Sequence, residues 1–192
     1  IHFIELTEAE QDLVLHGYHI RAYRVQHNVP CYGYCIEIPR SGRFDAAAAS
    51  ALGLPVQTWN RLQKGETILW EDKEYAPDMV MGPPRKGIKV AYCTDTRQID
   101  RIADNAKGAD LFICEGMYAE PDKLAKAKQY KHMTFYEAAE LAKKAEVKQM
   151  WLTHFSPSLV GAKGYMKDVK RIFAESYLGE DGKMLELDFL EE

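Results

Sequence analysis

Long apolar runs are absent from this sequence, and no stretch approaches the roughly 20 apolar residues that a membrane-spanning helix needs. Cysteine is scarce as well, and the cysteines form no paired CxxC motifs of the kind that build zinc-binding modules. We therefore expect no membrane association and no structural zinc finger. The four cysteines, Cys31, Cys35, Cys93 and Cys114, are better explained as small buried thiols in a reducing, cytoplasmic compartment.

Two further absences concern the partners and the extent of the chain. There is no excess of positive charge, because 25 lysines and arginines stand against 29 aspartates and glutamates, for a net charge of −4. Binding to nucleic acid would therefore need a local patch or metal ions rather than a generally basic surface. There is no initiator methionine, and the first residues, Ile1–Leu6, have the composition of a strand. We expect the sequence to be a fragment of a longer protein.

The residues that are present have the pattern of an α/β protein. Over 192 residues, 46% are hydrophobic and 28% are charged, which is typical of an ordinary globular domain. Short apolar runs alternate with segments of helical periodicity, which predicts a layered α/β architecture. The predicted strands are Ile1–Leu6, Tyr18–Val25, Cys31–Ile38, Ile88–Cys93, Asp110–Cys114, Lys148–Leu152 and Lys183–Phe189, with Thr7–Leu15 as a polar connection. The predicted helices in the second half are Gln98–Ala106, Pro121–Lys128, Phe135–Ala145 and Lys163–Ser176.

Residues 40–86 differ in composition from the segments on either side. They hold four of the eight prolines, a predicted alanine-rich helix at Asp45–Leu52, a short amphipathic segment at Thr58–Lys64 and a predicted hairpin at Thr67–Tyr75. We predict an insertion between two strands, with little hydrophobic core of its own. Insertions of this kind often reach a partner or a substrate.

Three potential metal ligands, His27, Asp95 and His154, each follow a predicted strand. In open α/β sheets, ligands bind beyond the carboxyl ends of the strands, which is where these side chains are expected. Two imidazoles and a carboxylate suit zinc or another borderline divalent ion, and a carboxylate can bridge two ions. The residues alone leave simpler explanations open: Asp95 could cap the following helix, and each histidine could be a surface or packing residue.

Seven ordered segments carry a more specific signal. They are GYHIRAYRVQHNVPCYGYCIE, LQKGETI, GPPRKG, YCTDTR, ICEGMY, HMTFYEAAELAKKA and LTHFSPS. In this order they resemble the second half of ribonuclease Z, the tRNA 3′-processing endonuclease family of the metallo-β-lactamase superfamily, and the resemblance covers essentially the whole chain. It implies that residues 1–192 form the C-terminal half of a metallo-β-lactamase αβ/βα sandwich. It also implies that residues 40–86 are an inserted flexible arm that clamps tRNA.

The resemblance further implies roles for five residues. His27 and His154 each match a ligand of one zinc ion, and Asp95 matches the carboxylate that bridges the two ions. His132 matches the histidine that protonates the leaving oxygen, and Glu115 matches the acid that orients this histidine. Without the resemblance, His132 would be better explained as an inert neighbour of the helix that follows it.

The implied function is zinc-dependent removal of the 3′ trailer of precursor tRNA by two-metal phosphodiester hydrolysis, with manganese or magnesium as alternatives to zinc. The resemblance also implies that the protein forms a homodimer. The main metal motif of the family, HxHxDH, is absent here, so an N-terminal half carrying it is an implied partner and the isolated chain is expected to be inactive. Two other interpretations stay open: a phosphodiesterase of the same fold that acts on small substrates, and a non-catalytic fragment.

Overall fold

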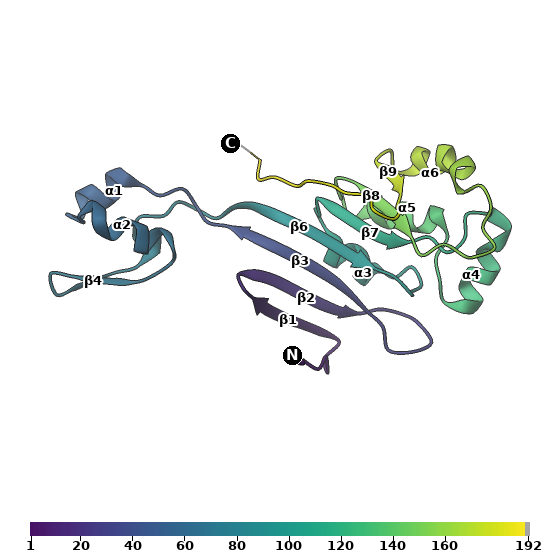
Figure 1. Cartoon of the computed structure of the whole chain (residues 1–192), viewed down its shortest axis with the longest axis horizontal. Helices are drawn as coiled ribbons and strands as arrows, with labels where there is room; N and C mark the ends of the chain where they lie inside the picture. Colours follow the sequence, from purple (N-terminus) through teal and green to yellow (C-terminus); the bar gives the residue numbers. More distant parts are fainter. Residues whose placement is uncertain (191–192) are drawn as a thin grey trace. The chain divides into compact units, whose positions relative to one another are not determined.

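A seven-stranded sheet in the order β1-β2-β3-β6-β7-β8-β9 is the largest element of the computed structural model, which describes residues 1–190 (Figure 1). Strands β1 to β3 pair antiparallel, whereas β6 to β9 are parallel to one another. The strands are β1 Glu10–Leu15, β2 Tyr18–Arg24, β3 Tyr32–Arg40, β6 Arg85–Cys93, β7 Leu111–Glu115, β8 Met150–Thr153 and β9 Ser176–Leu178. This mixed sheet with its helices confirms the predicted α/β class.

Helices connect the parallel strands of the sheet. Helix α3 (Asp100–Ala106) follows β6. The 3-10 turn η2 (Pro121–Lys123), α4 (Leu124–Tyr130) and α5 (Phe135–Lys144) follow β7, and η3 (Ala162–Tyr165) with α6 (Met166–Ile172) follow β8. Because these crossovers return each strand in the same direction, the carboxyl ends of β6, β7 and β8 meet at one edge. No helix within residues 1–190 is long and apolar enough to cross a membrane.

One face of the sheet is covered by helices and forms the main hydrophobic core. Successive side chains along a strand point to opposite faces, so alternate residues of β6, β7 and β8 contribute to this core. The strand residues are Ala91, Cys93, Phe112, Cys114, Met150 and Leu152, and they share the cluster with Ile102, Ala103, Leu141 and Val169 of α3, α5 and α6. Cys35 is also buried there and Cys31 is half-buried, which agrees with the expected role of the cysteines as buried thiols.

The opposite face of the sheet carries apolar side chains that stay exposed. The largest of these side chains are Tyr18, Ile36, Ile38 and Tyr92, whose exposed fractions range from 36% to 45%. The register places Ile36 beside Ile20, so apolar side chains of β2 and β3 are adjacent on this face. In α/β domains an apolar sheet face of this kind is normally covered by a second layer.

Pro39–Gly87 forms a second compact unit. Its elements are α1 Ala46–Ala51, α2 Val56–Gln63, β4 Ile68–Trp70, β5 Lys73–Tyr75 and the 3-10 turn η1 Pro77–Met79. The prediction that this segment has little core of its own is wrong. A separate hydrophobic cluster of Ala49, Leu54, Leu62, Ile68, Tyr75 and Val80 is bordered by Phe44, Trp59 and Trp70. A few large side chains supply most of this small core.

The remaining errors of the predicted secondary structure lie at the two ends of the chain. Ile1–Leu6 and Lys183–Phe189 form no strand, whereas part of the predicted connection Thr7–Leu15 is β1. Strand β1 forms because its residues pair with β2: Gln11 pairs with Ala22, and Leu13 pairs with Ile20. Ile1–Leu6 has no paired strand among the described residues. The predicted helix Lys163–Ser176 is also shorter than expected: α6 ends at Ile172, and Ser176 is the first residue of β9.

Candidate metal and catalytic site

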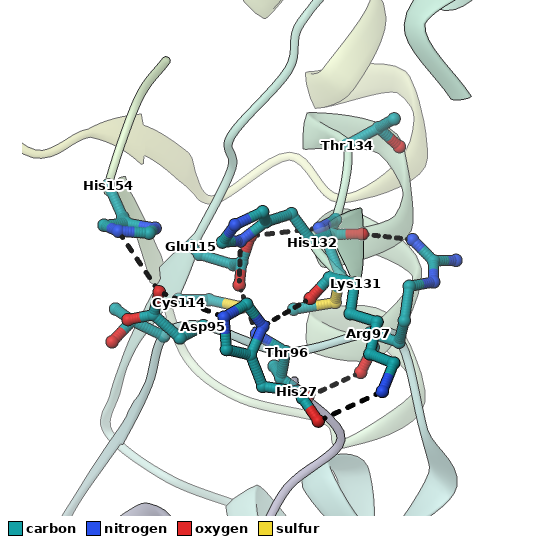
Figure 2. A network of polar contacts seen from close by, with 12 residues as sticks. His27, Asp95, Thr96, Arg97, Cys114, Glu115, Lys131, His132, Thr134 and His154 are labelled. Atoms are coloured by element: carbon teal, nitrogen blue, oxygen red, sulfur yellow. Dashed lines mark hydrogen bonds and ion pairs between the residues drawn. The ribbon is translucent and has the colours of Figure 1, made fainter. Parts of the chain in front are cut away.

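The five predicted site residues lie together beyond the carboxyl ends of β6, β7 and β8 (Figure 2). Asp95 follows β6 by two residues, Glu115 is the last residue of β7, and His154 directly follows β8. His27 comes from the connection between β2 and β3, and His132 from the connection between α4 and α5. The parallel crossovers thus bring together side chains that are up to 127 positions apart in the sequence.

The carboxylate of Asp95 lies between the two histidines predicted to bind metal. Nε2 of His154 lies 3.6 Å from Oδ1 of Asp95, and Nε2 of His27 lies 4.0 Å from the same oxygen. Two atoms that each lie about 2.1 Å from one zinc ion can be separated by up to about 4 Å, so this spacing suits ligands of a shared ion. A nitrogen of His132 also lies within 4.8 Å of ligand atoms of His27 and Asp95.

Hydrogen bonding to His27 favours the form of imidazole that binds metals. Nδ1 of His27 lies 3.1 Å from the carbonyl oxygen of Lys131. A carbonyl oxygen only accepts, so Nδ1 is the donor; of the two neutral tautomers, this selects the one with the lone pair on Nε2, the nitrogen that faces Asp95. A lone pair facing a carboxylate is stabilised by a cation between them. The donor set of His27, Asp95 and His154 therefore fits a divalent ion of the zinc type.

Glu115 and His132 form a second, more buried pair. The Glu115 side chain is fully buried, and its carboxylate accepts hydrogen bonds from the backbone N–H of Thr96 at 2.6 Å and of Met133 at 3.0 Å. His132 donates Nδ1–H to the same carboxylate at 3.1 Å. This hydrogen bond raises the pKa of His132 above its ordinary value, although burial opposes the change. The arrangement favours a protonated imidazole that can give up a proton from Nε2.

The His132 ring lies between the two histidines flanking Asp95. Its centroid is 5.0 Å from that of His27 and 5.4 Å from that of His154. A proton donor at His132 would consequently act beside any group held by the three candidate metal ligands. This arrangement combines a cation-binding set with an adjacent acid, which is suited to cleaving a phosphate ester.

Three residues of the site have a left-handed backbone. The φ angles of Asp95, Lys131 and His154 are 53°, 57° and 56°. Residues other than glycine adopt this conformation at a cost of about 1–3 kcal/mol and keep it only where the surroundings determine it. At Lys131 the conformation lets the chain leave α4 with the Lys131 carbonyl directed at His27.

The sequence did not single out Thr96, Arg97 or Lys131 as parts of this site. Thr96 accepts a hydrogen bond from Gln26 N–H through Oγ1, and the guanidinium of Arg97 donates to the carbonyl of His132. Lys131 contacts His27 twice, because its Nζ also donates to the His27 carbonyl at 3.2 Å. Adjacency to Asp95 and His132 was the only signal in the sequence, since each of these contacts joins segments distant along the chain.

Comparison of the sequence with a family model and with individual known proteins gives consistent results. A family model described as the Beta-lactamase superfamily domain matches residues 4–155. Ribonuclease Z of Agathobacter rectalis is 59% identical over 189 residues, which cover 98% of this chain and 62% of that protein. Ribonuclease Z of Lachnospira eligens is 56% identical over 190 residues, with 99% and 62% covered. The chain thus spans 62% of the length of both relatives, and the resemblance to part of ribonuclease Z is confirmed.

Solved structures share the fold at much lower sequence identity. YhfI of Bacillus subtilis, a metallo-beta-lactamase fold protein, superposes with a TM-score of 0.60 at 20% identity, covering 94% of this chain and 54% of YhfI. The short form of human tRNase Z gives a TM-score of 0.56 at 18% identity, covering 94% of this chain and 48% of that protein. These similarities confirm the predicted metallo-β-lactamase fold. The chain belongs to the beta-lactamase superfamily.

Proposed function

We propose that this chain is part of a metal-dependent endoribonuclease that removes the 3′ trailer of precursor tRNA. The observation that carries the proposal is the combination of 59% identity to a ribonuclease Z with the convergence of His27, Asp95, His132 and His154 at one edge of the sheet. The protein would work in the cytoplasm as a homodimer. A phosphodiesterase acting on small substrates would use the same site, and the two functions differ in what the rest of the chain must bind.

His27, Asp95 and His154 would hold two zinc ions, with Asp95 as the ligand common to both and with manganese or magnesium as alternatives. When bound, such ions supply charge neutralisation at the phosphate and activation of water. His27 would be held in its binding form by the Lys131 carbonyl. The other ligands would come from an HxHxDH segment, which this sequence does not contain.

His132 would act as the general acid. In the cleavage of a precursor tRNA, the bond between phosphorus and the 3′ oxygen of the discriminator ribose breaks as water attacks phosphorus. Nε2 of His132 would give its proton to the departing ribose oxygen, and an aspartate of the HxHxDH segment would accept a proton from the attacking water. Glu115 would keep the His132 ring oriented and favour its protonated form.

The unit at Pro39–Gly87 would bind tRNA away from the reacting phosphate. We propose that residues 40–86 are the arm that clamps the tRNA, on behalf of the other subunit of a homodimer. A small phosphodiester has no use for such a contact, which favours the tRNA substrate over the small-substrate alternative.

The exposed apolar face of the sheet supports a partner layer. Tyr18, Ile36, Ile38 and Tyr92 would be covered by the half of the fold that carries HxHxDH. The protein in which that half precedes this chain is called the longer protein below. The isolated chain, which does not contain the HxHxDH segment, would lack nuclease activity.

The test compares the isolated chain with the longer protein on a precursor tRNA in the presence of zinc or manganese. We expect cleavage after the discriminator nucleotide by the longer protein, no cleavage by the isolated chain, and no cleavage by the Asp95→Ala variant of the longer protein. Hydrolysis of small phosphodiesters without cleavage of the precursor would favour the alternative function. Trimming by the isolated chain that disappears in its own Asp95→Ala variant would contradict the requirement for the HxHxDH segment.

A further inference from the structure

The guanidinium of Arg97 is enclosed between the segments that carry Asp95 and His132. Its side chain is 13% exposed, and it donates one hydrogen bond to the backbone carbonyl of His132 itself. The same guanidinium forms a two-pronged ion pair with the carboxylate of Glu137, which is 11% exposed, with Nη1 donating to Oε2 at 3.1 Å. Arg97 therefore contacts both the catalytic histidine and the helix that follows it.

Glu137 is in turn fixed to the start of α5. Its carboxylate accepts the backbone N–H of Thr134 at 2.9 Å, and the Thr134 hydroxyl accepts the N–H of Glu137, which together make a capping box. Burial alone would raise the pKa of Glu137, but the hydrogen bonds from Arg97 and Thr134 lower it below its ordinary value. The Arg97–Glu137 pair is thus an ionised crosslink between the Asp95 loop and the first turn of α5.

The backbone of Arg97 extends this crosslink to the third segment of the site. Arg97 N–H donates to the carbonyl of Gln26 at 3.0 Å, the residue directly before His27. Arg97 therefore bonds through its backbone to the His27 segment and through its side chain to the His132 segment, and it belongs to the Asp95 loop itself. Removing the guanidinium would leave the Asp95 and His27 loops joined through the backbone but would release the carbonyl of His132.

We propose that Arg97 is a positioning residue that holds His132 in line to protonate the leaving oxygen, an inference that rests on the proposed function. The planar guanidinium has donors enough for a carbonyl and both oxygens of a carboxylate at once. A lysine at the same position keeps the charge but has no fork, so it cannot keep all of these contacts. The role of Arg97 therefore depends on geometry as well as on charge.

Leaving-group dependence separates this role from a purely structural one. The 3′ oxygen of ribose is a poor leaving group that needs a proton, whereas nitrophenolate leaves without one. A misplaced His132 should consequently slow the cleavage of precursor tRNA and spare the hydrolysis of bis(p-nitrophenyl) phosphate. A general loss of fold or of bound metal would reduce both reactions equally.

The experiment measures kcat and KM of the longer protein on both substrates for Arg97→Lys, Arg97→Met and Glu137→Gln. We expect kcat for precursor tRNA to fall about 10- to 100-fold in the two Arg97 variants, less in Glu137→Gln, with KM nearly unchanged. Hydrolysis of the nitrophenyl ester should change no more than about twofold. Arg171→Lys is the matched control, because Arg171 forms an exposed ion pair with Asp168 on α6.

Thermal unfolding and bound metal per chain are measured for every variant as readouts that do not depend on turnover. Unchanged metal content with a selective loss on precursor tRNA would support the proposal. Equal losses on both substrates, or wild-type rates on both, would overturn it while leaving the tRNA-processing function intact. A wild-type longer protein that hydrolyses the ester but does not cleave the precursor would overturn the proposed function, and this inference with it.

Discussion

Asp95 and His132 would serve the reaction in different ways, so their loss should have effects of different size. Replacing Asp95 by alanine removes the carboxylate that both flanking histidines face, at 3.6 and 4.0 Å, and would deprive both metal ions of a ligand. Replacing His132 by alanine removes only a proton donor, which typically costs about 10²–10⁴-fold in rate. In the longer protein we expect Asp95→Ala to be the more complete loss in single-turnover cleavage of precursor tRNA.

Asp95→Asn is the matched variant, because it keeps the shape of the side chain and an oxygen ligand while removing the negative charge. Its rate should lie between those of the wild type and Asp95→Ala, with metal content per chain following the same order. Equal rates for Asp95→Ala and His132→Ala would contradict the assignment of Asp95 as a shared ligand.

The family resemblance pointed to the five residues that the structure brings together, but the contacts that hold them could not be predicted from the sequence. The roles of these residues in metal binding and catalysis stay predictions. Asp95 and His154 were expected at strand ends, and the parallel crossovers place them there. Their left-handed φ angles, and that of Lys131, follow from tertiary contacts that no local pattern encodes. The hydrogen bond from His27 to the Lys131 carbonyl joins residues 104 positions apart, beyond the reach of any periodicity.

At the level of secondary structure, local signals succeeded where an element is stabilised by its own residues. Helix α5 begins where Thr134 and Glu137 predicted, because the capping box is contained in four consecutive residues. The failures, Ile1–Leu6 and Lys183–Phe189, are segments whose strand character depends on a neighbouring strand. Pairing of that kind is a property of the fold and cannot be recognised within six or seven residues.

Helix α5 offers a direct test of how strongly its cap contributes. The Thr134 hydroxyl accepts the backbone N–H of Glu137 at 3.2 Å and donates to the Glu137 carboxylate at 3.0 Å. In the longer protein, Thr134→Ala should lower the free energy of unfolding by about 1 kcal/mol, measured by urea denaturation. Thr134→Ser keeps the hydroxyl and should cost clearly less, whereas equal losses would show that the methyl group matters more than the hydrogen bonds.

At the level of the whole molecule, two features are consistent with the proposal that this chain is one half of a larger fold. One face of the sheet is covered by α3, α5 and α6, while the other presents exposed apolar residues such as Ile36 and Tyr92. Under the proposed function, the edge that gathers His27, Asp95 and His154 would need further ligands from an HxHxDH segment to hold two ions. A single partner layer carrying HxHxDH would cover the apolar face and complete the metal set, so one proposed half accounts for both features.

If the unit at Pro39–Gly87 binds tRNA, as proposed, its removal should distinguish a tRNA-processing enzyme from a phosphodiesterase for small substrates. Its hydrophobic cluster lies entirely within residues 44–80, so its removal leaves no cavity in the main core. The chain enters and leaves it by neighbouring strands, β3 and β6, and Gly82 N–H bonds the Arg43 carbonyl at 2.8 Å, so a short linker can close the gap. Replacing Arg43–Arg85 by a Gly-Ser linker should therefore keep the rest of the longer protein folded.

The kinetic effect of this deletion should depend on the substrate. Contacts to tRNA far from the scissile phosphate are kept in both the bound substrate and the transition state, so losing them raises KM and changes kcat little. A nitrophenyl phosphodiester does not extend to the arm, and its hydrolysis should remain within about twofold of the wild type. Steady-state kinetics on both substrates, with circular dichroism to verify folding, provide the measurement. Equal losses on both substrates would mean that residues 40–86 serve the structure alone, and the tRNA substrate would lose its main support outside the site.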